Sequence, residues 1–85
     1  MAVRIELPQT CWEVSWCLGW NIKDWSIDEI TYAAKTRDII KIKCHRPHRS
    51  EIFNEDYIRT NVFFDYGEAM QYLREKESSK EIDLI

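Results

Sequence analysis

The stretch CWEVSWCLGW, residues 11–20, carries the clearest pattern in the chain. Apolar side chains recur at every second position, which is the spacing of a strand with one buried face. On such a strand one face would carry Trp12, Val14, Trp16, Leu18 and Trp20. Aromatic and β-branched residues favour strands, so we predict a strand here, or two strand halves joined by a bend at Gly19.

A helix is the alternative for the same residues. Thr10 and Glu13 have the spacing of a capping box, and Gly19 could end the helix. The three tryptophans of the stretch would then follow one another at intervals of four residues along one side. We favour the strand because of the aromatic content.

Two elements flank this stretch. Alternation over residues 3–7 predicts a short strand that ends at Pro8. Ser26 and Glu29 form a second capping box, and the apolar residues behind it recur at helical spacing. The sequence therefore predicts a helix over residues 27–36, with a stripe made of Ile27, Ile30 and Ala34.

The second half of the chain again shows strand-like alternation, followed by a helical pattern. Residues 38–45 predict a strand, residues 46–56 a long connection, and residues 57–65 another strand with Ile58, Thr60, Val62 and Phe64 facing inward. Asp65 is placed to cap a final helix, with Glu68 at its third position. The apolar stripe of that helix would consist of Tyr66, Ala69, Met70 and Leu73.

These elements predict an α+β fold. Their order is ββαββα, or the ferredoxin-like βαββαβ if the first short strand is dropped and a last strand is added. We expect an antiparallel sheet with two helices packed on one face. From the length of 85 residues we expect a single domain, residues 1–85, in which residues 78–85 form a frayed tail or an edge strand.

Composition favours a cytoplasmic protein. Three cysteines are an odd number, unlike a secreted disulfide scaffold. The first residues lack the basic and then apolar pattern of a signal peptide, and no apolar run is long enough to span a bilayer. We therefore expect a cytoplasmic location and no membrane partner.

The motifs of catalysis are missing from the sequence. Gly19 and Gly67 are the only glycines, so there is no phosphate-binding loop. Cys44 and His45 are adjacent, and on a strand they would point to opposite faces and could not form a nucleophile–base pair. We expect a chain that is not an enzyme and that needs no cofactor.

Zinc binding is one alternative that the sequence leaves open. Soft ligands of the kind that tetrahedral zinc prefers are supplied by Cys11, Cys17, Cys44 and His48. The cysteines are not spaced as zinc knuckles, however, and buried free cysteines need no metal. A small structural domain, stabilised by zinc or by forming a homodimer, remains an alternative.

Nucleic-acid binding is a second alternative. The segment 35–49 is rich in lysine and arginine, and Lys41 and Lys43 share a strand face. Residues 57–73 resemble the third strand and second helix of the RNA-recognition-motif family through Val62, Phe64, Ala69 and Leu73. Arg59 and Asn61, however, stand where that family has its stacking aromatics.

Protein binding is the reading that we favour. The chain has four Trp, four Tyr and three Phe, which is more than a two-layer domain of this size is expected to bury. Exposed aromatics beside charged side chains are typical of interfaces. The expected contact surface consists of Trp20, Trp25, Phe53, Tyr57 and Phe63, flanked by Lys41, Lys43, Arg46 and Arg49.

In size and acidity, though in no motif, the chain resembles phage-encoded anti-defence proteins such as the anti-CRISPR and anti-restriction proteins. The resemblance implies a small protein that docks on a larger enzyme or nucleoprotein complex and inhibits it. The partner would then be another protein or a nucleoprotein, with a homodimer or direct nucleic-acid contact as alternatives.

Overall fold

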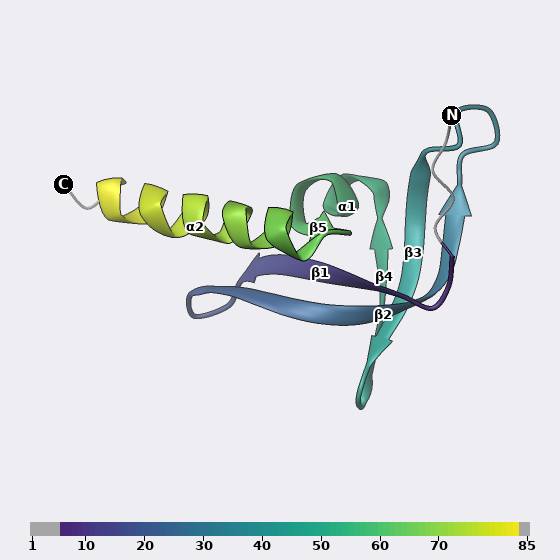
Figure 1. The fold of residues 1–85 in the computed structure, drawn as a ribbon, viewed down its shortest axis with the longest axis horizontal. Coiled ribbons are helices and arrows are strands. Elements are labelled where there is room, and N and C mark those ends of the chain that lie inside the picture. The colour runs from purple at the N-terminus through teal and green to yellow at the C-terminus, as the bar shows by residue number, and fades with distance from the viewer. Residues whose placement is uncertain (1–5, 84–85) are drawn as a thin grey trace.

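Four consecutive antiparallel strands build most of the sheet, and a fifth short strand extends it at one edge (Figure 1). The computed structural model describes residues 6–83, with side chains up to residue 78. The strand order across the sheet is β4-β3-β2-β1-β5. The elements are β1 Gln9–Trp16, β2 Trp20–Tyr32, β3 Ile39–Arg46, β4 Arg49–Asn54, α1 Glu55–Asn61, β5 Val62–Phe63 and α2 Tyr66–Asp83. An antiparallel five-stranded sheet with two helices confirms the predicted α+β class.

Residues 11–20 form strands, as the period of two predicted. β1 and β2 make a hairpin whose ladder runs from Gln9↔Ile27 to Trp16↔Trp20. The chain turns at residues 17–19, where Gly19 has a φ of 131°, so the predicted bend is present. A positive φ is a conformation that glycine adopts without steric cost.

The predicted helix over residues 27–36 is wrong, because β2 continues through Tyr32. The ladder between β2 and β3 is irregular between Ile27 and Glu29. Ile27 pairs with Cys44 and Ile30 with Ile42, so two residues that are three apart both reach the buried face. A β-bulge inserts one extra residue and shifts the alternation. This shift produced the helical spacing on which the prediction relied.

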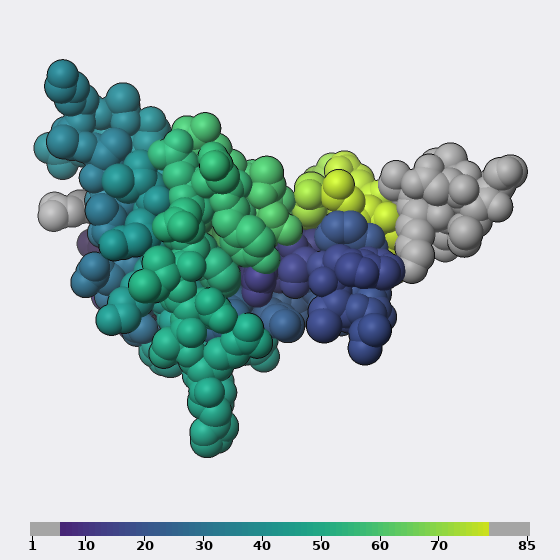
Figure 2. Space-filling view, turned by 180° about the vertical axis from the view of Figure 1, so that it is seen from behind, coloured from purple at the N-terminus to yellow at the C-terminus, as the bar shows by residue number. Residues whose placement is uncertain are grey.

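The connection predicted over residues 46–56 is also wrong. Pro47 and His48 form a two-residue turn between β3 and β4, with Arg46 paired to Arg49 across it. His48 takes a φ of 66°, a value for which sequence rules expect glycine or asparagine. Figure 2 shows this teal turn projecting beyond the rest of the molecule.

Residues 57–65 form a helix and a short strand instead of the one strand predicted. Helix α1 starts after Asn54 with two acidic residues in its first turn, and Arg59 bonds Glu55 at 2.9 Å. Ile58 and Val62 are both buried. Their spacing of four suits one side of a helix as well as one face of a strand, so the pattern alone could not separate the two.

The final helix is confirmed at its start. The backbone N–H of Glu68 donates to Asp65 Oδ2 at 3.0 Å, which is the predicted cap. Helix α2 extends to Asp83, so the tail or edge strand predicted over residues 78–85 is helical up to that residue. Residues 84–85, like most of the strand predicted over 3–7, lie outside the described residues. Neither helix in the described range is long and apolar enough to cross a membrane.

Helix α2 packs on the face of β1 that carries Trp12. The rings of Trp12 and Tyr66 meet edge to face at 5.6 Å. Phe63 is the ladder partner of Trp12, and its ring lies 5.1 Å from that of Tyr72. Paired residues share a face of a sheet, so α2 covers this side of β1 and β5.

Helix α1 packs on the other face. Ile58 of α1 belongs to one buried cluster with Cys11, which neighbours Trp12 on β1 and therefore points the opposite way. The prediction that both helices pack on one face is thus wrong. The short strand β5 adds to the free edge of β1, and the chain passes from one side of the sheet to the other there.

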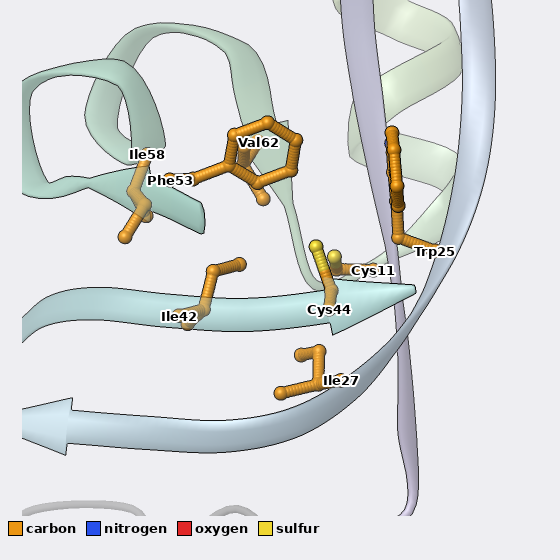
Figure 3. Close-up of a cluster of buried hydrophobic side chains, with 8 residues drawn as sticks. All are labelled: Cys11, Trp25, Ile27, Ile42, Cys44, Phe53, Ile58 and Val62. Carbon is orange, nitrogen blue, oxygen red and sulfur yellow. The ribbon is translucent and has the colours of Figure 1, made fainter. Parts of the chain in front are cut away.

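The main core lies on the α1 side (Figure 3). The rings of Trp25 and Phe53 meet at right angles at 5.5 Å, and Phe53 stacks on Tyr57 at 5.1 Å. Aromatic pairs of this kind stabilise a core beyond the area they bury. The buried cluster consists of Cys11, Trp25, Ile27, Ile42, Cys44, Phe53, Ile58 and Val62.

Candidate functional site

A buried carboxylate organises the open end of the core. Glu13 is only 8% exposed, although the alternation of β1 placed it on the face expected to be polar. The indole N–H of Trp25 donates to Glu13 Oε1 at 3.0 Å, and the hydroxyl of Tyr57 donates to Oε2. Burial, together with the hydrogen bond to Glu13, raises the pKa of Tyr57 above its usual value. Tyr57 therefore remains a neutral donor at physiological pH.

A cleft of about 330 Å³ opens above this carboxylate. Lys23 lies directly opposite Glu13 in the ladder between β1 and β2. Across the cleft, Arg49 bonds Glu51 at 3.0 Å on β4. The lining residues are Glu13, Lys23, Trp25, Arg49, Glu51, Ile52, Phe53, Asn54 and Tyr57.

Two arginines cover the Trp25 ring. The guanidinium of Arg46 lies 5.6 Å from the ring centroid and that of Arg49 lies 5.9 Å from it, within the range of cation–π contacts. With Phe53 packed on it as well, Trp25 is only 1% exposed. The cleft therefore combines two basic side chains, Lys23 and Arg49, with two acidic ones, Glu13 and Glu51, around an aromatic floor.

Four of the nine predicted contact residues line this cleft, and a fifth, Arg46, lies over the Trp25 ring beside it. Trp25 and Phe53, however, belong to the core and are 1% and 7% exposed, so the expectation that they stand free at the surface is wrong. They are sheltered because β4 and α1 close over this side of the sheet, which the sequence prediction lacked. The five residues are Trp25, Arg46, Arg49, Phe53 and Tyr57.

Two other predicted residues lie on the α2 side. Trp20 is partly buried, with the ammonium group of Lys76 at 5.7 Å from its ring. Phe63 is also partly buried, against Tyr72. They belong to the opposite side of the sheet from the cleft and cannot act with it as one surface.

The basic segment is divided between both faces of the sheet. Lys41 and Lys43 are exposed on the outer face of β3, whereas Ile42 between them is buried. Arg46 and Arg49 lie on the core side, over Trp25. The alternation of β3 therefore splits what had looked in sequence like one continuous phosphate-binding patch.

Sequence reasoning did not identify Glu13, Lys23 and Glu51 as residues of the cleft. Nothing in the sequence indicated that Glu13 is buried, because the alternation placed it on the face of the strand that was expected to be polar. The signal that could have identified it is its cross-strand position opposite Lys23, which becomes visible only when the hairpin register is known.

The four residues considered for zinc are not brought together. Cys11 and Cys44 are buried in the core, where burial raises the pKa of each thiol to about 12. Cys17 is exposed in the β1–β2 turn and His48 in the β3–β4 turn. Within residues 6–83, no group of three or more His, Cys, Asp or Glu side chains has the geometry to hold a metal ion.

A second exposed surface lies at the tip of the β1–β2 hairpin, which we call the hairpin tip, residues 16–20. Trp16 is 52% exposed and Leu18 is 101% exposed. Leu18 also has a φ of 57°, in the left-handed region. The side chain of Asn21 donates to the carbonyls of Cys17 and Gly19 at 3.1 and 2.9 Å, which fixes the turn.

Sequence reasoning included Trp20 of the hairpin tip among the expected contact residues but missed Leu18, because it assigned Leu18 to a buried strand face. Comparison of the chain with family models, curated proteins and solved structures found no match.

Proposed function

We propose that this chain is a small protein-binding module, without catalysis of its own, that docks on a larger enzyme or nucleoprotein complex and inhibits it. Anti-CRISPR and anti-restriction proteins act in this style. The observation that supports the proposal is the hairpin tip, where Leu18 is fully exposed in a left-handed conformation.

Leucine is unfavourable at this position in the free protein. The left-handed region costs a residue with a Cβ about 1–2 kcal/mol. An exposed leucine recovers none of this cost by burial. In an apolar pocket of a partner, the same side chain would gain about 1.5–3 kcal/mol. Strained backbone of this kind clusters at binding sites.

The hairpin tip is also preorganised for docking. No charged residue lies between Trp16 and Trp20, and their rings meet edge to face at 5.8 Å. The Asn21 hydrogen bonds hold the turn before any partner arrives. Little conformational entropy is therefore lost on binding, which favours affinity.

The decisive variant is Leu18→Asn, because asparagine tolerates the left-handed region. We expect this protein to keep or raise its thermal midpoint and to lose its partner in affinity capture from native cells. The matched control is Leu7→Asn, at an exposed leucine away from the tip, which should retain the partner. Retention of the partner by Leu18→Asn would contradict the proposal.

A second experiment tests the alternative that the protein binds nucleic acid. Gel-shift titration at low and high salt would detect it, because counterion release makes such binding strongest at low salt. We expect no shift with the isolated protein. Tight binding at low salt that Lys41→Glu with Lys43→Glu removes would replace protein docking with the nucleic-acid alternative.

A further inference from the structure

We infer that the cleft above Glu13 binds a free α-amino acid with an aromatic side chain. Lys23 pairs with the carboxylate of this ligand, Glu51 accepts from its ammonium group, and its ring lies against Tyr57. The cleft shares no residue with the hairpin tip. A ligand bound there is therefore independent of the proposed docking.

Lys23 provides the cleft with a cation that forms no ion pair. Its side chain is partly buried and lines the cleft, yet no carboxylate of the described residues pairs with it. Glu13 lies opposite in the ladder, but its two oxygens accept from Trp25 and Tyr57. A partly buried ammonium group without a counter-ion is unfavourable. The carboxylate of a ligand would supply the missing charge-assisted hydrogen bond.

Glu51 provides an acceptor for the opposite charge. Arg49 donates to it from Nε at 3.3 Å and from a terminal nitrogen at 3.0 Å, and both contacts use Oε1. Oε2 accepts no hydrogen bond from the described residues. An ammonium group can therefore donate to Oε2 while the pair with Arg49 stays intact. Arg49 is also held over the ring of Trp25, so Lys23 is the cation that a ligand meets first.

The balance of charge in the cleft selects a ligand that carries both signs. Lys23 and Arg49 share the cleft with Glu13 and Glu51. An anion bound to Lys23 would lie near two carboxylates, and a cation bound to Glu51 would lie near Arg49. Like charges placed together oppose binding. A zwitterion satisfies both sides, and an α-amino acid holds its two charges on one carbon.

The floor of the cleft selects the side chain of the ligand. Phe53 stacks on Tyr57 at 5.1 Å, and Tyr57 remains partly exposed whereas Trp25 and Phe53 are buried. An aromatic side chain of the ligand extends this stack. The volume of about 330 Å³ lies at the lower end of the range of about 300–1,000 Å³ for small-molecule sites. It suits a single amino acid better than a larger cofactor.

The test compares ligands that differ by one charge. Isotope-labelled full-length protein is titrated with L-phenylalanine, with N-acetyl-L-phenylalanine, which lacks the ammonium group, and with L-phenylalaninamide, which lacks the carboxylate. Amide chemical shifts report the site and the affinity. We expect phenylalanine to shift residues of the cleft and to bind at least about tenfold more tightly than either derivative. L-Alanine, which has both charges but no ring, should also bind more weakly.

Two variants assign each charge to its residue. Lys23→Met should weaken phenylalanine binding about tenfold and leave phenylalaninamide binding unchanged, because that ligand has no carboxylate to pair. The variant should fold normally, since Lys23 forms no ion pair. Glu51→Gln should weaken phenylalanine binding and leave N-acetyl-phenylalanine binding unchanged. Lys43→Met, at an exposed lysine on the outer face of β3, is the matched control and should bind like the wild type.

Several results would overturn the inference. Equal affinity for phenylalanine and N-acetyl-phenylalanine would mean that the cleft recognises a carboxylate alone. An equal loss of phenylalanine and phenylalaninamide binding in Lys23→Met would exclude the assigned pair. Absence of phenylalanine binding, with partner capture through Leu18 intact, would refute the amino-acid site and leave the proposed function standing. Leu18→Asn should bind phenylalanine like the wild type, so the two sites can fail separately.

Discussion

At the scale of single residues, Glu13 is the polar group on which the core depends. Its carboxylate is buried and accepts from both Trp25 and Tyr57. Buried donors without an acceptor cost about 1–3 kcal/mol each. Glu13 therefore joins β1 to β2 and to α1 through hydrogen bonds that apolar packing cannot replace.

We predict that Glu13→Ala lowers the free energy of unfolding by more than about 2 kcal/mol, because two buried donors lose their acceptor. Glu13→Gln should be intermediate, since the amide oxygen can still accept from Trp25. Urea denaturation measures both variants. Glu75→Ala, at an exposed site on α2, is the control, and an equal effect of the two alanine variants would disprove this role.

At the scale of elements, the helices and strands that were predicted correctly are those with a local signal. The cap of α2 is such a signal, because Asp65 accepts from Glu68 without help from the rest of the fold. The strand structure of residues 11–20 is another, since period-two alternation and a glycine lie within one short stretch, although the sequence left open whether one strand or two halves would form.

For the cap we predict that Asp65→Ala destabilises the protein by about 1 kcal/mol, within the usual range for loss of an N-cap. Asp65→Asn should destabilise the protein by much less, about a few tenths of a kcal/mol, because the amide oxygen of asparagine can also accept a hydrogen bond from a backbone N–H in the first turn of the helix. Thermal or urea unfolding of the three proteins gives the comparison. Similar loss in both variants would mean that the charge of Asp65, and not capping, matters.

The elements that were predicted wrongly have patterns that suit two structures. The bulge in β2 places Ile27 and Ile30 on one face at a spacing of three. Ile58 and Val62 are four apart, which suits a helix and a strand alike. In both places contacts between distant segments decided between helix and strand, and these contacts cannot be predicted from the pattern of a single sequence.

At the scale of the whole molecule, the three thiols differ in their surroundings. Cys11 and Cys44 lie in the central cluster, and burial raises the pKa of each to about 12, from 9.0 for a free thiol. In the unfolded chain both thiols ionise near the lower value. The folded state therefore retains these protons over a pH range in which the unfolded state releases them.

It follows that the free energy of unfolding falls as pH rises from about 9 towards about 12, because unfolding is then coupled to proton release. Below pH 9 this contribution is fully present. In the native protein at pH 8, a thiol reagent should label only Cys17, whereas all three cysteines should react in denaturant. Cys17→Ser should abolish native labelling, and labelling of a second thiol in the wild type would contradict the burial of the cluster.

The sequence by itself determined the α+β class, the extended structure on either side of Gly19 in residues 11–20, and the start of the last helix. Each of these rests on interactions between residues that are close in the chain. The tertiary structure alone decided that Trp25 and Phe53 are buried, that the basic segment is split between two faces, and that Leu18 stands exposed at a tip. The physical reason is that strand register and edge position arise from contacts between distant segments, and these contacts decide which side chains remain at the surface.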